Sequence, residues 1–251
     1  MLLCETSKSH KKLAYQRFAC SPVDESLMDK IASRLFCSLV AFILVLPVNV
    51  GAFDELNEPQ TLIYDTDHLG KTKEGSSIIY TYERTQNDAE PLSDEVILSI
   101  KKSREDARRD VSVNFLSGDI KLHLPDFDNY RGNPVIIGML EHVAQSMGYD
   151  TGGGALYFRN RIRDQLASKH VTVNRRSDSA VMADQSIAVA EFSFAPLKND
   201  PYVGDNPELT EATITLTFSE EIPGYLVSIA YVSGPGNKPE TTRTLKFSGV
   251  Q

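Results

Sequence analysis

The chain has 251 residues, 41% of them hydrophobic, and a formal net charge of −8 at pH 7, which is enough material for one large domain or two small ones. An acidic chain is repelled by phosphate backbones and anionic lipid surfaces, so its charge argues against nucleic acid as a general partner. The sequence contains no Gly-x-Ser-x-Gly elbow, no phosphate loop and no metal-ligand spacing, so we predict no enzyme activity, no catalytic residue, no metal and no cofactor.

The first part of the chain resembles a leader for export. An uncharged apolar run, Leu35–Leu46, follows Lys30 and Arg34 and leads into small residues that end at Ala52. This layout is typical of a signal peptide, and we expect cleavage after Ala52. A retained membrane anchor is the alternative, but a bilayer span needs roughly 20 apolar residues. A signal peptide that starts at Met28 has ordinary proportions, so we expect translation to begin there.

The leader also holds every cysteine, namely Cys4, Cys20 and Cys37. Residues 53–251 would then form a single β-rich domain that has no thiol and depends on core burial alone. The formal charge of this part is −10, because the leader carries more basic than acidic residues. We expect a soluble periplasmic protein that is not embedded in the membrane after signal cleavage.

After the leader, short segments rich in β-branched and aromatic residues recur between Gly, Asn, Asp and Pro. Several of them alternate apolar and polar residues, which is typical of an antiparallel sheet with one face on a core. We predict a tight Pro-Gly turn at Ile222–Tyr225. The ten predicted strands are Thr61–Asp65, Ser76–Arg84, Asp94–Lys102, Asp110–Leu116, Asp119–Leu124, His170–Asn174, Gln185–Phe194, Glu211–Phe218, Leu226–Val232 and Thr242–Phe247.

The pattern changes to a helical period after Asn133. Asn133 as N-cap, Pro134 at the first position and Gly148 just past the end predict a helix that reaches Met147. After three glycines, a second helix is predicted over Ala155–Ala167, although its residues also alternate as in a strand. The predicted fold class is therefore α+β, mainly β: a curved antiparallel sheet or open half-barrel of about ten strands, with a helical hairpin inserted at about residues 133–167.

The apolar faces of the two helices are candidates for one wall of a ligand cavity, because a helical hairpin over a curved sheet encloses apolar space. The alternative is that the same side chains make a filled core. The candidate residues are Ile136, Leu140, Val143, Met147, Phe158, Ile162 and Leu166.

Charged and polar clusters carry weaker signals. Arg159, Arg161 and Arg163, with Arg175 and Arg176, form a basic cluster that would bind an acidic partner or make ion pairs on a solvated face. The segment with Asp126, Asp128 and Asn129 lacks the spacing of a calcium loop. The remaining histidines share no ligand spacing, and we expect them exposed or at the core edge: His68, His123, His142 and His170.

Two stretches, Tyr130–Met147 with its Arg-Gly-Asn-Pro start and Gly153–Arg163, resemble an uncharacterised family of exported proteobacterial proteins over most of the chain after the leader. The order of strands, the helical insertion and the segment Pro223–Val227 are similar in pattern to the half-barrel of the periplasmic lipoprotein-carrier group (LolA and LolB). This second resemblance implies a periplasmic carrier or sensor of lipid-like ligands, and it assigns no functional residue to a position in this chain.

The leading functional hypothesis is a soluble periplasmic protein that holds an apolar, lipid-like ligand such as an acyl chain without chemical change. The alternative is a cell-envelope interaction module with a filled core, whose arginine cluster docks another protein. A hydrolase of unknown substrate is the third hypothesis.

Overall fold

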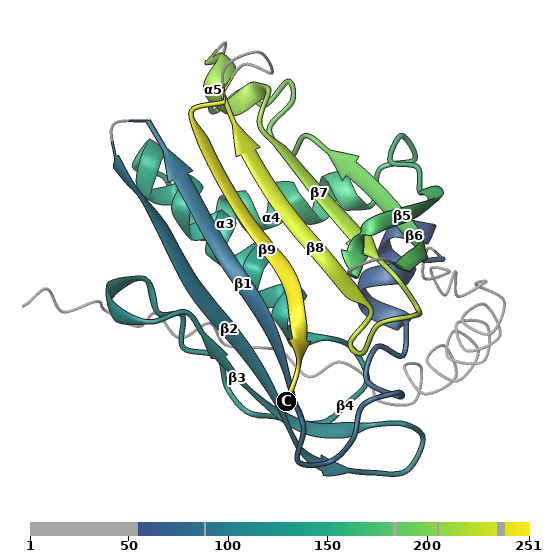
Figure 1. Ribbon diagram of the computed structural model, residues 1–251. Coiled ribbons are helices and arrows are strands. Elements are labelled where there is room, and N and C mark those ends of the chain that lie inside the picture. Colours follow the sequence, from purple (N-terminus) through teal and green to yellow (C-terminus); the bar gives the residue numbers. More distant parts are fainter. Residues whose placement is uncertain (1–54, 88, 183–184, 205, 235–238) are drawn as a thin grey trace, which may run out of the picture. The chain divides into compact units, whose positions relative to one another are not determined.

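One antiparallel sheet with helices on one of its faces makes up the part of the chain that the structure describes (Figure 1). The computed structural model describes residues 55–87, 89–182, 185–204, 206–234 and 239–251. The predicted signal peptide and the three cysteines lie outside these residues.

Nine strands are found in the described residues, and every neighbouring pair is antiparallel. The strands are β1 (Ser77–Gln86), β2 (Ala89–Ser103), β3 (Arg109–Phe115), β4 (Phe127–Tyr130), β5 (Asn174–Met182), β6 (Gln185–Phe194), β7 (Thr213–Phe218), β8 (Leu226–Ser233) and β9 (Thr241–Val250). The helical segments are α2 (Glu58–Gln60), the π-helical turn η1 (Thr61–Asp65), the 3-10 turn η2 (Gly118–Ile120), α3 (Pro134–Thr151), α4 (Ala155–Leu166) and α5 (Pro207–Thr210).

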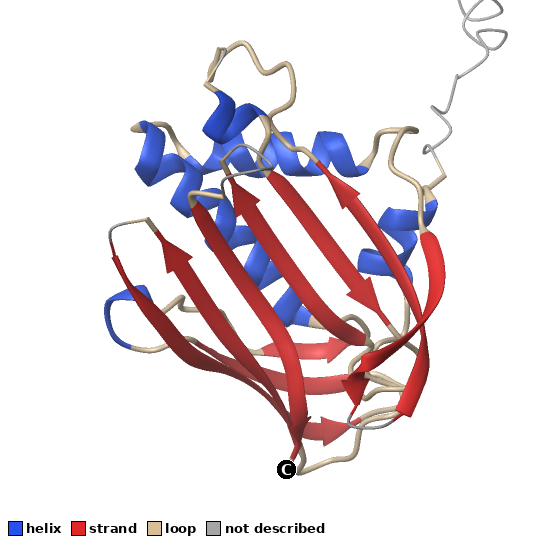
Figure 2. Ribbon diagram, turned by 45° about the horizontal axis from the view of Figure 1, so that its top comes forward, coloured by secondary structure: helices blue, strands red, loops and turns tan. Residues whose placement is uncertain are grey.

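The strand order is β4-β3-β2-β1-β9-β8-β7-β6-β5, so the last strand lies between the first strand and β8. β4 and β5 are the two edges of the sheet, which is open. α3 and α4 connect these edges across one face, which we call the concave face (Figure 2). The predicted fold class is confirmed, with nine strands in place of about ten.

The curvature of the sheet has a local cause. The pairing register shifts within the β1–β2, β1–β9, β2–β3, β3–β4 and β7–β8 ladders. Each such bulge adds twist and bends its strand. The bends accumulate along the sheet, and they turn its inner side chains toward the helices.

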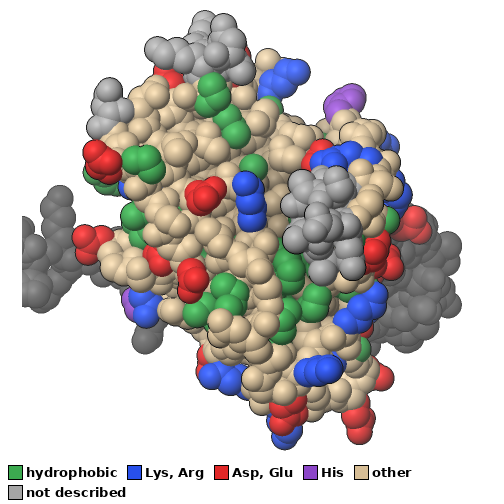
Figure 3. All heavy atoms as spheres, viewed as in Figure 1, with side chains coloured by type: hydrophobic (Ala, Val, Ile, Leu, Met, Phe, Trp, Pro, Cys, Tyr) green, Lys and Arg blue, Asp and Glu red, His purple; other side chains and the backbone are tan. Residues whose placement is uncertain are grey.

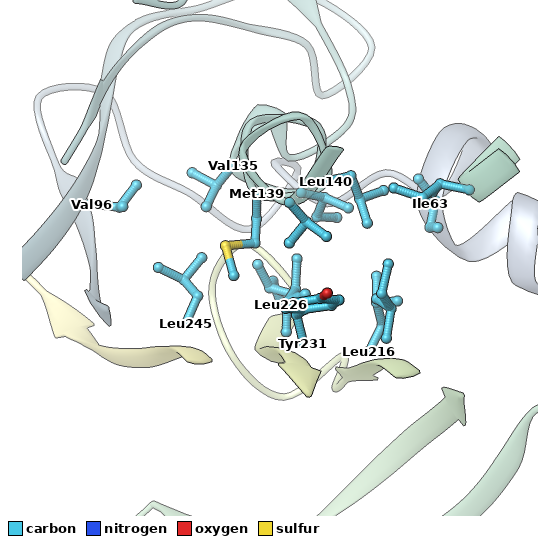
Figure 4. Packing of buried hydrophobic residues seen from close by; sticks show 14 of the residues in the cluster. Ile63, Val96, Val135, Met139, Leu140, Leu216, Leu226, Tyr231 and Leu245 are labelled. Atoms are coloured by element: carbon cyan, nitrogen blue, oxygen red, sulfur yellow. The ribbon is translucent and has the colours of Figure 1, made fainter. Parts of the chain in front are cut away.

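The main core lies between the concave face and α3. In Figure 4, Val135 and Met139 of α3 point toward Leu245 of β9, and Leu226 and Tyr231 of β8 lie below the same helix. The backbone of α3 approaches β3 closely, because a Cβ on Gly138 would lie 2.8 Å from the Phe115 ring. Among the described residues, no helix is both long and apolar enough to cross a bilayer.

The predicted start of α3 is confirmed, and its predicted end is wrong. Asn133 is the N-cap, its side-chain oxygen accepts a hydrogen bond from Val135 N at 3.1 Å, and Pro134 is the first helical residue. The helix does not end before Gly148 but continues to Thr151. It ends there because Gly152 takes the left-handed conformation (φ 69°) that a C-terminal cap needs.

The second helix is confirmed over Ala155–Leu166, with Ala167 as its C-cap. Phe158, Ile162 and Leu166 are its buried residues, at the predicted four-residue spacing. The three glycines form the joint between the helices.

Two of the predicted strands, Thr61–Asp65 and Asp119–Leu124, are wrong. Thr61–Asp65 is the π-helical turn η1, because Asn57 and Gln60 form a reciprocal capping box that starts a helix just upstream. Asp119–Leu124 contains η2 and only an isolated bridge between Phe115 and Leu122.

The remaining differences concern strand boundaries and one turn. β4 forms at Phe127–Tyr130, a segment that was not predicted as a strand and that holds two of the three residues considered for calcium. The strand predicted at His170–Asn174 begins only at Asn174, as β5. The Pro-Gly turn is confirmed, since Tyr225 N donates to Ile222 O at 3.2 Å and Gly224 has a φ of 79°.

Candidate functional site

The helical residues that the sequence predicts as a cavity wall all lie in the main core. Val143, Met147, Phe158 and Leu166 have no exposed surface, and Leu140 retains the most, at 7%. They pack in one cluster with the inner side chains of the sheet. Side chains of both layers therefore occupy the space beneath the helical hairpin.

The arginines of α4 make ion pairs with carboxylates of this chain. Arg159 binds both carboxylate oxygens of Glu141 on α3, each at 2.7 Å. Arg161 lies 3.0 Å from Asp164 and 3.8 Å from the buried Asp200, and Arg163 lies 3.4 Å from Asp164. The Arg159–Glu141 pair links α4 to α3 on their solvent side, whereas the contacts of Arg161 and Arg163 stay within α4 or reach Asp200 in a loop.

A small cavity of about 250 Å³ is lined by some of the predicted apolar cavity residues and by some of the predicted arginine cluster. Leu140 and Ile162 contribute its apolar surface, Arg159 and Arg163 contribute its charged edge, and Tyr64 of η1 lies opposite. Its volume is below the roughly 300 Å³ at which small-molecule pockets begin.

A larger cleft of about 580 Å³ lies at the other end of the concave face, and we call it the β6 cleft. It lies between η1, β5, β6 and the turn from β7 to β8. The apolar residues that line it are Leu62, Ala188, Val189, Ala190, Phe218 and Tyr225. The polar and charged residues that line it are Thr66, Arg175, Arg176, Ser177, Ser219, Glu220 and Glu221.

Small residues on β6 create the space of the cleft. Side chains alternate along a strand, so Ala188 and Ala190 face the same side as Phe192 and Phe194, which are buried in the core. Ala190 pairs with Phe218 of β7, whose ring forms the floor. The change from phenylalanine to alanine along one face leaves a hollow at the end of the sheet.

Three of the four charged residues that line the cleft, Arg175, Arg176 and Glu221, have partners within the chain. Arg175 makes an ion pair with Glu58 of α2, and Arg176 Nη2 lies 2.9 Å from Glu191 Oε2. Glu221 Oε1 accepts a hydrogen bond from Ala188 N at 2.7 Å. The cleft therefore combines an apolar interior with a rim in which the two arginine charges are balanced by carboxylates.

His68 supports the wall of the cleft from the core side. Asn133 N–H can only donate, so His68 Nδ1 accepts that bond at 2.9 Å, and Nε2–H donates to Leu62 O at 2.8 Å. The ring stacks on Phe218, with ring centroids 5.9 Å apart. Burial lowers the pKa of His68 to about 4, and the uncharged ring thus holds Leu62 in place.

The four histidines lie in three kinds of environment: exposed, partly buried and fully buried. His123 and His170 are exposed, as expected, and His142 is partly buried against Tyr82. His68 is fully buried, which corrects the prediction of an exposed or core-edge position. Within the described ranges, no three His, Cys, Asp or Glu side chains are grouped to hold a metal ion.

Sequence reasoning missed the β6 cleft, but a signal for it was present. The strand Gln185–Phe194 places two alanines and two phenylalanines on one face in order, and that change in size marks where the core ends. Leu62 was missed because its segment was predicted as a strand.

Comparison with known proteins assigns no family. No family model matches the chain, and no curated protein matches it. A solved structure of a LolA superfamily protein from Nitrosomonas europaea is similar at 9% identity and a TM-score of 0.21, over 77% of this chain and 92% of that chain. The resemblance to an exported proteobacterial family stays a prediction.

Proposed function

We propose that this protein binds an apolar, lipid-like small molecule in the β6 cleft and carries it without chemical change. The observation that carries the proposal is the cleft itself, about 580 Å³ of space on the concave face with Leu62, Ala190 and Phe218 among its lining residues. This volume lies within the roughly 300–1,000 Å³ range of small-molecule sites. With the expected leader, the protein would act in the periplasm.

The apolar lining of the cleft suits an aliphatic chain. Each buried methylene contributes about 0.8 kcal/mol, and association itself costs roughly 4 kcal/mol or more. A ligand therefore needs several methylenes in contact with Leu62 and Phe218 before it binds at all. Binding should strengthen with chain length until the cleft is full.

The rim favours an uncharged or zwitterionic ligand. Arg175 and Arg176 have carboxylate partners in Glu58 and Glu191. A ligand with a single charge would have to compete with these internal partners. An uncharged chain end meets no such competition.

The groups around the cleft also support binding without reaction. Both ring nitrogens of His68 are engaged by backbone groups, and the Tyr225 ring lies under the Lys71 ammonium at 5.4 Å. A general base needs a free lone pair that points at the substrate. His68 has none, because Asn133 N–H occupies it.

A substitution that fills the cleft tests the proposal. In Ala190→Met, the longer side chain should occupy the floor beside Phe218 and weaken binding of the uncharged fluorescent dye N-phenylnaphthylamine about tenfold, since it displaces roughly two methylenes of ligand. Dye fluorescence, with dodecanol as competitor, measures the change.

The matched control is Ala230→Met, which makes the same substitution at a partly buried position on the opposite face of β8. Dye binding should be the same in this variant as in the wild type. A wild-type protein that binds neither dye nor dodecanol, or an Ala190→Met protein that binds them unchanged, would contradict the proposal.

A further inference from the structure

Two arginines lie side by side on the concave face, at the end of the sheet away from the β6 cleft. Arg84 of β1 pairs directly with Arg243 of β9, and Arg243 pairs with Tyr231 of β8. Tyr225, which precedes β8, lines the cleft, so roughly 17 Å of strand between Leu226 and Tyr231 separates the two places. The outer face of the same sheet, which Figure 3 shows, has its charged side chains scattered among uncharged ones.

Both arginines are at least partly buried. Arg243 is only 5% exposed, and its guanidinium lies over the Tyr231 ring at 5.5 Å. Arg84 follows the fully buried Tyr82 by two residues, so it faces the same side, and it is partly exposed. The pair is therefore reachable from solvent through Arg84.

The two guanidinium groups have unsatisfied donors. Arg84 Nε and Arg243 Nη1 are buried and make no hydrogen bond. Within the part of the chain that the structure describes, no ion pair involves either residue. Asp94, which acts electrostatically on the neighbouring Tyr82, instead accepts hydrogen bonds from Ser117 and Glu95.

The nearby histidine, His142, adds no compensating charge. His142 of α3 lies with Nε2 3.0 Å from the Tyr82 hydroxyl. Burial, with Arg243 and Arg84 nearby, lowers the pKa of His142 to about 4, so the ring is neutral at neutral pH. Two like charges opposite each other on neighbouring strands repel, and a buried charge without a partner is costly.

We propose that Arg84 and Arg243 form an oxyanion-binding site that takes a phosphate group. The planar guanidinium fork presents parallel N–H donors that match two phosphate oxygens. A bound phosphate accepts hydrogen bonds from the partly exposed Arg84 and offsets the repulsion between the two cations. The site is separate from the β6 cleft and does not depend on ligand binding there.

The phosphate can come from two sources that share this chemistry. One is free inorganic phosphate, and the other is the phosphate head group of an amphiphile. Titration calorimetry with inorganic phosphate and with dodecyl phosphate distinguishes them.

The wild-type protein should bind at least one of these two probes, and Arg84→Gln should weaken that binding tenfold or more. Arg84→Lys keeps the charge but loses the fork, so it should weaken binding at least threefold. Arg159→Gln is the control, because it removes an exposed arginine that is already paired with Glu141. Ala190→Met should leave phosphate binding unchanged, which separates this site from the cleft.

Arg84 is the residue to change first because it is partly exposed, whereas Arg243 is deeply buried. Thermal unfolding gives a second measurement, in which phosphate should raise the Tm of the wild type but not of Arg84→Gln. Binding of dodecyl phosphate alone, dependent on Arg84, supports the site and assigns the head group as its ligand. Absence of binding by both probes, or an equal loss in Arg159→Gln, would overturn the proposal.

Discussion

Asn133→Ala should lower the free energy of unfolding by about 3–7 kcal/mol, although the residue lies in a short loop before a helix. Its side-chain nitrogen donates to the Tyr80 hydroxyl at 2.7 Å and to Gly224 O at 2.9 Å, while its oxygen caps α3 at Val135 N. Loss of the cap costs about 1 kcal/mol, and each buried partner left unsatisfied adds about 1–3 kcal/mol.

Urea denaturation of matched variants separates these contributions. Asn133→Ser retains a capping oxygen but cannot reach both Tyr80 and Gly224, so it should recover only about 1 kcal/mol of the loss. The exposed Asn114 of β3 provides the control, since Asn114→Ala should change stability by about 0.5 kcal/mol or less. Equal losses at positions 114 and 133 would show that the hydrogen bonds of Asn133 contribute little.

The protein should lose stability as the pH falls from about 6.5 to about 4. Burial lowers the pKa of His68, and likewise of His142, from 6.5 to about 4 in the folded chain. Between these values the unfolded chain binds a proton at each histidine and the folded chain does not, so the stability contributed above pH 6.5 is lost on acidification. A shift of this size corresponds to about 3 kcal/mol for His68.

Urea denaturation at a series of pH values measures this loss. In His68→Gln the slope of stability against pH should become shallower in the same window, whatever the absolute stability of the variant. The exposed His123 serves as the control, because His123→Gln should keep the wild-type slope. Glu208 acts in the opposite direction, because burial raises its pKa and its stabilising effect is therefore lost as the pH rises. A flat profile between pH 6.5 and 4.5 would contradict an uncharged, buried His68.

The elements that the sequence predicts well are those with local chemical causes. Asn133 and Pro134 start α3 because a capping side chain and a fixed φ act within a few residues. The Pro-Gly turn at Ile222–Tyr225 and the strands on either side of it are also predicted correctly, because their causes too lie within a few residues. The end of α3 was missed because Gly148 is tolerated inside the helix, where it packs closely against the Gly153 carbonyl.

Local composition predicts the wrong secondary structure where a nearby helix cap or a tertiary contact has a stronger effect than the propensities of the residues themselves. Thr61–Asp65 has the β-branched and apolar content of a strand, yet the capping box at Asn57 starts a helix and Ile63 is buried in the main core. The signal was in the sequence, as Asn57 and Gln60 at capping-box spacing. β-propensity alone does not detect such a cap, because it depends on side-chain content and not on capping hydrogen bonds.

The sequence by itself determined the fold class, the helical hairpin, its apolar stripe and the turn at Ile222–Tyr225, because each depends on periodicity or on chemistry within a few neighbouring residues. Only the tertiary structure decided that β9 lies between β1 and β8, and with it that Arg84 and Arg243 are neighbours. It also decided that the helical stripe packs into a core while open space remains beside Ala188 and Ala190. Pairing between residues more than 150 positions apart is decided by the assembly of the whole sheet, and no local pattern in the chain encodes it.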